Sequence, residues 1–331
     1  MIRKLDRAIE TIERHDRCLI ACHVNPEGDA LGSMLALALA LERRGKRAIR
    51  LSPDGVPRQY AFLPTSDQVT TRLPSRLPPL AVVVDCDGIE RTGPEWRQIA
   101  SVGDLVDIDH HATGNTFGNV IVVDPRAAAT AEIVYRLVRR AREPIDADLA
   151  ICLLTGIIVD TGRFSFANTT PTTHRIAADL MRAGAEPAAI CREIYESRTL
   201  EETRLIGRAL ASIRGTRDGR VVWTSIDWPT LAAATANGRA PEDMISDLRA
   251  IREAEVALLF TETADGSVRV SMRSKGAVNI SEIAAAFQGG GHPGAAGCSL
   301  EGPLSRGPSR IIPRVREALR KASRDGRRRT R

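Results

Sequence analysis

A short apolar run ends in one acid and two histidines at Leu105-Val106-Asp107-Ile108-Asp109-His110-His111. The run predicts a buried strand, which the small and turn-forming residues 112–115 bring to an end. The polar cluster is therefore expected at the strand's carboxyl end, where open α/β sheets bind ligands. Imidazole and carboxylate groups together suit manganese, zinc or iron. A lone Asp-His-His is more often a capping or core cluster, so its weight depends on other segments that end in the same way.

Two strands and a helix elsewhere in the chain also end in metal-competent side chains. These side chains are His23, Glu27 and Asp29 in a Pro/Gly loop after a strand over residues 18–22, Asp85 after a strand over residues 80–84, and Asp160 after a buried helix over residues 148–158. A second helix, over residues 34–41, follows the first loop and points its amino end at it. All the candidates are thus expected on one rim of a parallel sheet.

With His110, the candidates number six metal-competent side chains. One divalent ion uses three or four protein ligands plus water, so six exceed what one ion needs. Two ions about 3.5–4 Å apart that share one carboxylate would use them all, and such a pair suits in-line phosphoryl displacement. The residues therefore predict phosphoester hydrolysis. Three further acids, Asp87, Asp107 and Asp124, are interpreted as turn or surface residues.

Composition favours a cytoplasmic globular protein. The 331 residues, 43% of them hydrophobic, suffice for two domains with ample core. No apolar run has the length of a membrane span, and the first sixteen residues are charged throughout, so neither a membrane segment nor a secretory signal is expected. The six cysteines form no Cys-x-x-Cys pair and are interpreted as reduced core residues.

The excess positive charge of +6 lies entirely in the last twelve residues of the chain. From Arg320 to Arg331 seven basic residues stand against one acid, whereas residues 1–319 carry 40 of each sign. Such a terminus is typical of a disordered, solvated tail, with weak attraction of RNA as the alternative. A processive nuclease would be expected to carry a basic groove within the body, so the neutral body favours substrates of about two to five nucleotides.

The pattern of elements predicts two α/β domains. Residues 1–186 are expected to form a parallel sheet with helices on both faces, residues 187–214 a helical connector, residues 215–319 a smaller domain, and residues 320–331 the tail. In the smaller domain, residues 288–297 are too rich in glycine to predict a packed element. They are interpreted as a loop that places His292 beside backbone amides, as in an anion cradle. A terminal amphipathic helix is predicted over residues 311–322.

Five motifs in order resemble those of the DHH phosphoesterase superfamily. They are His23-x-Asn25-Pro26-Glu27-Gly28-Asp29-Ala30-x-Gly32-Ser33, Val84-Asp85, Asp109-His110-His111, Asp160-Thr161-Gly162 and Gly289-Gly290-Gly291-His292-Pro293-x-Ala295-Ala296-Gly297. The likeness covers nearly the whole chain except the basic tail and is greatest to the nanoRNase/pAp-phosphatase branch. It implies a DHH domain and a smaller DHH-associated domain, with the active site in the cleft between them.

The resemblance implies a role for each matching residue. His23, Glu27 and Asp85 would hold one metal, and Asp29, Asp85, His110 and Asp160 the other, with Asp85 bridging. His111 would face the substrate phosphate, and Asp109 would orient an imidazole. In the second domain, the phosphate or terminal nucleotide would be gripped by Arg273, Ser274, Gly290, Gly291 and His292.

The resemblance also implies the substrates and cofactors. Members of this branch hydrolyse very short RNAs, 3′-phosphoadenosine 5′-phosphate (pAp) and, in some cases, linear or cyclic dinucleotides such as cyclic di-AMP to mononucleotides. They usually use two manganese ions and are often homodimers. One alternative is a manganese-dependent inorganic pyrophosphatase, which shares the ligand pattern but not the Gly-Gly-Gly-His run. The other is a non-catalytic nucleotide-binding regulator whose metal site has decayed.

Glu27 departs from the family pattern, which commonly has aspartate at this position. The extra methylene moves the carboxylate by more than 1 Å, roughly one bond length, unless the loop adjusts. We predict that Glu27→Asp keeps or raises manganese-dependent phosphoesterase activity, measured as initial rate against manganese concentration. A large loss of activity would instead mean that the loop is built around glutamate.

Overall fold

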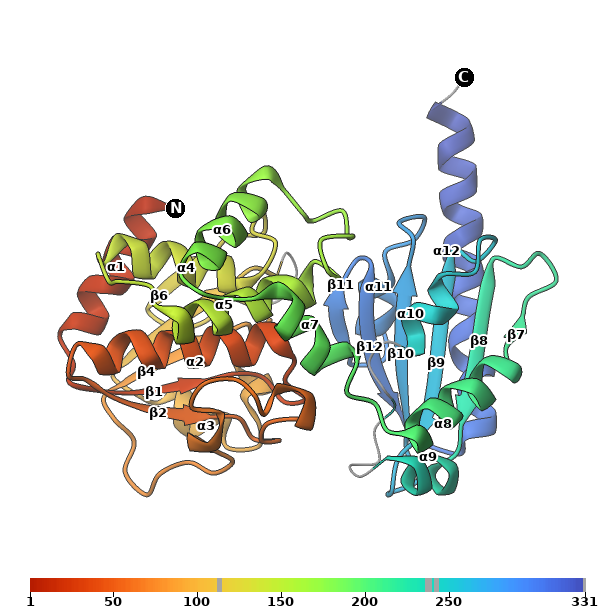
Figure 1. Cartoon of the computed structure of the whole chain (residues 1–331). Coiled ribbons are helices and arrows are strands. Elements are labelled where there is room, and N and C mark those ends of the chain that lie inside the picture. Colours follow the sequence, from red (N-terminus) through yellow and green to blue (C-terminus); the bar gives the residue numbers. More distant parts are fainter. Residues whose placement is uncertain (112–114, 236–239, 241–243, 330–331) are drawn as a thin grey trace. The chain divides into compact units, whose positions relative to one another are not determined.

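Two six-stranded sheets organise the chain, one in each of the units Met1–Ser197 and Arg198–Arg331 (Figure 1). The computed structural model describes residues 1–111, 115–235, 240 and 244–329, with the backbone alone for His292 and residues 324–329. The division between the units falls within the segment 187–214 that the sequence predicts as a connector. Each unit is therefore described by itself.

The first unit alternates strands and helices. Its elements are α1 (Ile2–Glu13), β1 (Arg17–Ala21), α2 (Gly28–Arg43), β2 (Arg47–Leu51), η1 (Arg58–Tyr60), η2 (Ser66–Gln68), β3 (Val69–Thr70), β4 (Leu80–Val84), η3 (Ile89–Thr92), α3 (Trp96–Ala100), β5 (Asp104–Asp109), β6 (Val120–Val123), α4 (Thr130–Arg140), α5 (Ala147–Asp160), α6 (Pro171–Arg182) and α7 (Pro187–Tyr195). The strands pair in the order β3-β2-β1-β4-β5-β6, and every pair is parallel.

The strand order reverses direction between β1 and β4. These strands are hydrogen-bonded neighbours although β2 and β3 lie between them in the sequence. The chain therefore leaves β1 toward one edge of the sheet and β4 toward the other, which opens a crevice at their carboxyl ends. His23 follows β1 and Asp85 follows β4, so the fold brings both to this crevice.

Alternate residues of the strands supply two cores. Ile20, Val82 and Ile108 pack with residues of α2, α4 and α5 on one face of the sheet (Figure 1). Leu19 and Val83 pack on the other face, where Ile99 of α3 joins them. Because a parallel sheet is covered on both faces, its strands are apolar runs rather than alternating ones. The predicted α/β fold class is confirmed.

Helix α2 begins six residues earlier than the sequence predicts, at Gly28 rather than Met34. The glycines of this segment are therefore close-packing residues and not turn formers. A Cβ at Gly32 would lie 2.3 Å from the carbonyl oxygen of Cys152, and one at Gly28 would lie 2.5 Å from Cγ2 of Val159. Close packing of α2 on α5 thus outweighs the low helix propensity of glycine.

The second unit builds a mixed sheet. Its elements are α8 (Leu200–Ala211), β7 (Arg214–Gly215), β8 (Val221–Ile226), α9 (Trp228–Ala234), α10 (Met244–Arg249), β9 (Val256–Glu262), β10 (Val268–Ser274), α11 (Ile280–Ala285), β11 (Gly290–His292), β12 (Ala295–Leu300), η4 (Leu304–Arg306) and α12 (Gly307–Arg329). The order is β11-β12-β10-β9-β8-β7, and only β8 and β9 run parallel among the described pairs. Leu258 and Phe260 face α11 and α12, while Leu259 faces α8 and α10.

The glycine-rich run is a hairpin, so its interpretation as a loop is wrong. Strands β11 and β12 pair antiparallel, with Gly290 opposite Gly297 and Gly291 opposite Ala296. Gly291 has a φ of 130°, and a Cβ at Gly289 would lie 2.1 Å from the carbonyl oxygen of Gly297. The glycines are needed because the two backbones approach closely and one residue is left-handed.

Helix α12 exceeds its predicted span of 311–322 at both ends, so the predicted tail begins inside this helix. Its apolar stripe, formed by Ile311, Val315 and Leu319, is buried on the sheet of the second unit. Among the residues described, none of the helices combines the length and the hydropathy that a membrane span requires.

We predict that Gly32→Ala destabilises the protein by about 1–3 kcal/mol or more, because its methyl group would overlap the backbone of α5. The midpoint of urea-induced unfolding measures the effect. Gly207→Ala in α8 is the matched control: its Cβ would have nothing within 4 Å, so a gain of roughly 0.5–1 kcal/mol is expected. An unchanged midpoint for Gly32→Ala would contradict the packing argument.

Candidate metal centre

The first cluster consists of His23, Glu27 and Asp85. Nε2 of His23 lies 3.6 Å from Oε1 of Glu27 and 3.6 Å from Oδ2 of Asp85. Nδ1 of His23 lies 2.8 Å from the carbonyl oxygen of Val24, which can only accept, so Nδ1 donates and Nε2 faces the two carboxylates. His23 and Asp85 are buried, whereas the side chain of Glu27 is 46% exposed.

The second cluster consists of Asp29, His110 and Asp160. Nε2 of His110 lies 3.0 Å from Oδ2 of Asp160 and 3.8 Å from Oδ2 of Asp29. Its Nδ1 faces the carbonyl oxygen of Ala127 at 3.2 Å. Asp29 lies in the first turn of α2 and Asp160 is the last residue of α5, so helix ends as well as strand ends supply this cluster.

Asp85 lies between the two clusters. Its Oδ2 faces His23, and its Oδ1 lies 3.7 Å from Nε2 of His110. The residue has a φ of 57°, in the left-handed region, and its side chain is 1% exposed. A non-glycine residue in this conformation at the end of β4 is a strained feature of the kind found at functional sites. The turn aims one carboxylate at both clusters.

The spacing of these atoms fits divalent metal ions. Hydrogen bonds between nitrogen and oxygen span about 2.7–3.2 Å, so the contacts of 3.6–3.8 Å at Asp29 and Asp85 are too long to be hydrogen bonds. Two ligand atoms that each lie about 2.1 Å from one ion are separated by roughly 3.0–4.2 Å. The donor set of imidazole nitrogen and carboxylate oxygen also suits such ions. The residues present therefore fit a metal centre.

His111 and Asp109 form a pair beside the clusters. Nδ1 of His111 lies 2.6 Å from Oδ1 of Asp109, which also accepts a hydrogen bond from the backbone N–H of His110. Nδ1 of His111 lies 4.0 Å from Oδ1 of Asp85. The imidazole that Asp109 orients is thus that of His111 rather than that of His110.

The carboxylates shift the titration of the histidines. Burial alone would lower the pKa of His23, but Asp85 and Glu27 outweigh it and raise the pKa to about 10. Burial is likewise outweighed at His110, where Asp160, Asp29 and Asp85 hold the pKa well above its usual value. For Asp29, burial and the neighbouring carboxylates of Asp85 and Asp160 raise the pKa well above its ordinary value. All three shifts favour the protonated form of a group in the cluster, which opposes the buried negative charge.

Sequence reasoning missed the contribution of the first turn of α4. The backbone N–H groups of Thr130 and Ala131 donate to Asp29 at 2.6 and 2.9 Å, and the hydroxyl of Thr130 donates to Asp85 at 2.9 Å. The local sequence indicates this contribution only weakly. A run of small residues at 127–129 is followed by threonine, and this pattern predicts a helix start but no contact with the site. A helix amino end stabilises nearby carboxylates, so this segment is part of the site.

Two acids interpreted as turn or surface residues are buried. Asp107 lies within β5 and is 1% exposed, and burial together with Asp109 raises its pKa to about 7. Asp124 is 4% exposed, and its carboxylate is paired with Arg126 and Arg136. The interpretation of Asp107 as a turn or surface residue is therefore wrong, whereas Asp124 is buried but does begin a turn, in which its Oδ1 accepts a hydrogen bond from the N–H of Arg126. Neither residue belongs to the two clusters.

In the second unit, the candidate substrate-binding residues lie around β12. Arg273 pairs with Ala295 from one side of this strand, and His292 pairs with the same residue from the other. The side chain of His292 lies outside the described residues. Ser274 is buried, and its hydroxyl accepts a hydrogen bond from the N–H of Gly276. The register thus gathers the candidates at one end of the sheet.

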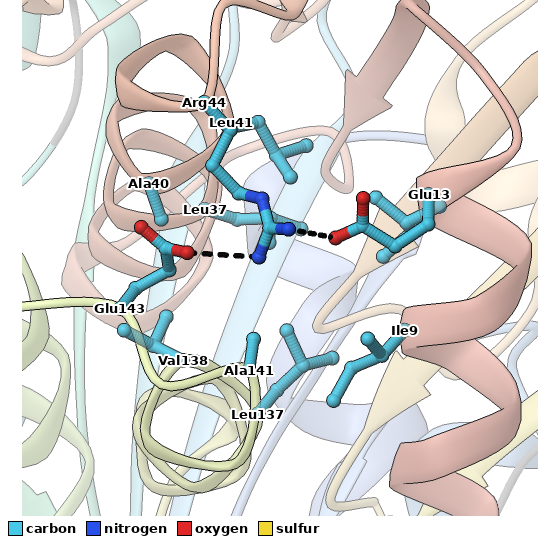
Figure 2. A pocket seen from close by; sticks show the side chains of 11 residues that line it. Ile9, Glu13, Leu37, Ala40, Leu41, Arg44, Leu137, Val138, Ala141 and Glu143 are labelled. Atoms are coloured by element: carbon cyan, nitrogen blue, oxygen red, sulfur yellow. Dashed lines mark hydrogen bonds and ion pairs between the residues drawn. The ribbon is translucent and has the colours of Figure 1, made fainter.

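A small apolar pocket lies elsewhere in the first unit, between α1, α2 and α4 (Figure 2). The guanidinium of Arg44 lies beside it and bridges Glu13 and Glu143 at 2.7 and 2.8 Å. None of the six candidate ligands lines this pocket. Both guanidinium contacts go to carboxylates, so Arg44 is already neutralised here.

Comparison with known proteins finds matches in both units of the chain. Residues 17–157 match the DHH family N-terminal domain, and residues 226–323 match the DHHA1 domain. The chain is 36% identical over 304 residues to the bifunctional oligoribonuclease and PAP phosphatase NrnA of Thermus thermophilus, covering 92% of this chain and 90% of that protein. The protein of the same name from Bacillus subtilis is 28% identical over 296 residues, covering 88% of this chain and 92% of the relative.

The fold also matches a solved structure. An exopolyphosphatase-related protein from Bacteroides fragilis superposes with a TM-score of 0.83 at 23% sequence identity, covering 96% of each chain. This likeness supports the fold that the sequence predicts.

We predict that the metal-free protein loses thermal stability as pH rises from about 6.5 to about 10. Because the folded pKa of His23 lies above its ordinary value, the stabilisation from its protonation is complete below pH about 6.5 and lost as pH approaches 10. Melting temperatures in EDTA across this range measure the loss, which His23→Gln should reduce. His174→Gln, which removes an exposed imidazole outside the clusters, should keep the wild-type slope. Equal slopes for His23→Gln and wild type would contradict the assignment.

Proposed function

Because the chain belongs to the DHH family, we propose that it is a two-metal phosphoesterase that hydrolyses short oligoribonucleotides and pAp to mononucleotides. The bifunctional relatives match over nearly their whole length, which supports both activities. Linear and cyclic dinucleotides such as cyclic di-AMP are further proposed substrates, because they present the same phosphodiester linkage to the same centre.

The observation that carries this proposal is the shared carboxylate of Asp85. One oxygen faces His23 of the first cluster and the other faces His110 of the second. A single metal site would not need a buried acid between two sets of ligands, whereas a pair of ions with a common ligand would. We propose His23, Glu27 and Asp85 for one ion, and Asp29, Asp85, His110 and Asp160 for the other.

The two ions are proposed to be manganese. Calcium and magnesium ions bind mainly to oxygen ligands. A site that combines imidazole nitrogen with carboxylate oxygen therefore favours Mn²⁺ over these two ions. When bound, the pair would supply Lewis-acid activation of water and of the phosphate. The exposed carboxylate of Glu27 makes the first cluster the more accessible of the two.

His111 is proposed to contact the substrate phosphate. Its Nδ1 lies 2.6 Å from Oδ1 of Asp109, which orients the ring, and Nε2 is the nitrogen proposed to donate to an anion. Burial alone would lower the pKa of His111, but Asp109 and Asp85 outweigh it and raise the pKa. A protonated imidazole in that position stabilises negative charge as it develops on the phosphate oxygens.

In the second unit, Arg273 and Ser274 at the end of β10 are proposed to grip the phosphate or terminal nucleotide, together with Gly290, Gly291 and His292. These glycines lie in β11, next to β12, whose residue Ala295 pairs with both Arg273 and His292. Arginine supplies the planar donor that phosphate recognition uses.

The remaining proposals concern the setting of the enzyme. All six cysteines are free thiols, which supports a cytoplasmic location in a reducing compartment. A homodimer is proposed from the resemblance to the nanoRNase/pAp-phosphatase branch.

The test is turnover of pAp, a dinucleotide, a cyclic dinucleotide and pyrophosphate, with and without manganese. We expect manganese-dependent release of AMP and phosphate from pAp and of mononucleotides from the dinucleotide, quantified by chromatography. Asp85→Ala should abolish turnover on every substrate, because both clusters lose a ligand. The matched control is Asp104→Ala at the amino end of β5, which should retain turnover.

Three outcomes would contradict the proposal. Hydrolysis of pyrophosphate alone would replace it with an inorganic pyrophosphatase. Tight dinucleotide binding without product release in excess manganese would replace it with a regulator. Turnover that survives Asp85→Ala would remove the bridging role.

A further inference from the structure

The turn into α4, residues 127–131, contacts three of the proposed metal ligands without supplying one. The carbonyl oxygen of Ala127 faces Nδ1 of His110, and the N–H of Ala131 donates to Oδ1 of Asp29. Thr130 makes two contacts: its N–H donates to Oδ2 of Asp29 at 2.6 Å and its hydroxyl donates to Oδ1 of Asp85 at 2.9 Å. One residue thus joins the second cluster to the shared carboxylate.

We propose that Thr130 is a positioning residue of the metal centre, whose hydroxyl fixes the carboxylate of Asp85 between the two clusters. This inference rests on the proposed two-metal function. It assigns to Thr130 no contact with metal or substrate, only the orientation of the ligand that both ions would share.

The geometry of the carboxylate explains why it needs fixing. If Asp85 offers one oxygen to each ion, rotation about its Cβ–Cγ bond would turn both oxygens away. The hydroxyl of Thr130 donates to Oδ1, which also lies 3.7 Å from Nε2 of His110 in the second cluster, while Oδ2 lies 3.6 Å from Nε2 of His23. A hydrogen bond to a metal ligand of this kind raises metal affinity by pre-orienting the ligand.

Thr130 is itself held in place. Its side chain is completely buried, so water does not compete for the hydroxyl. Threonine is β-branched and therefore stiff about χ1, and its position at the start of α4 fixes its backbone. Because the bond to Asp29 comes from the backbone, it survives any non-proline substitution, and a side-chain change isolates the contact with Asp85.

The test is the affinity of the metal-stripped, full-length protein for Mn²⁺ by isothermal titration calorimetry. Thr130→Val keeps the shape and removes the hydroxyl, so we expect affinity to fall by about 10- to 100-fold. Thr130→Ser restores the donor and should bring affinity back close to wild type. Thr130→Ala, which removes the hydroxyl without adding a methyl, should weaken binding as Thr130→Val does and is the second variant should the valine fail to fold.

The matched control is Thr155→Val. Thr155 is also completely buried in the first unit, but its hydroxyl makes no hydrogen bond to any described residue. The same substitution there should leave Mn²⁺ affinity unchanged. A general effect of placing valine in the core would weaken both variants alike.

Kinetics separate positioning from mere stability. With pAp as substrate, Thr130→Val should raise the Mn²⁺ concentration for half-maximal rate about 10- to 100-fold, with activity recovered at high Mn²⁺ and little change in KM for pAp. Wild-type Mn²⁺ affinity in both Thr130→Val and Thr130→Ala would overturn the inference and leave the proposed function intact. Failure of the wild-type protein itself to bind Mn²⁺ would overturn both.

Discussion

The structure of the first unit depends on one constraint: three buried or nearly buried carboxylates, Asp29, Asp85 and Asp160, meet within contact distance of one imidazole. Such a concentration of negative charge away from water is costly unless cations or donors oppose it. In the metal-free protein this negative charge is offset by histidines whose raised pKa favours protonation and by the backbone N–H groups at the start of α4. Divalent ions would take the place of those protons, so the energetics of the fold and the chemistry of the site have the same origin.

Much of this arrangement follows from local sequence. Parallel strands such as β4 are uninterrupted apolar runs because both faces are covered, and a polar residue directly after each run marks the carboxyl edge. Elementary pattern reasoning therefore suffices to locate Asp85 and His110 at that edge. The reversal of strand order at β1 and β4 then determines where these edge residues meet.

What the sequence conceals is long-range packing. Gly32 suggests a loop because its partner, the backbone of Cys152, lies far away in the chain. The bond from Thr130 to Asp29 spans 101 residues and has no local signature beyond a helix start. The hairpin at Gly291 is hidden because glycines that permit close strand pairing have the same composition as a loop. Sequence reasoning wrongly placed Asp107 in a turn or at the surface, because aspartate is depleted in strands and a lone acid is rarely buried in one.

The order in which the chain supplies its ligands has a consequence for biosynthesis. The first cluster draws on residues up to Asp85, but the second is incomplete until Asp160, the last residue of α5, has been made. A nascent chain that ends before Asp160 would therefore lack part of the second cluster. Under the proposed ligand sets, both metal sites exist only in a chain that has been synthesised through Asp160.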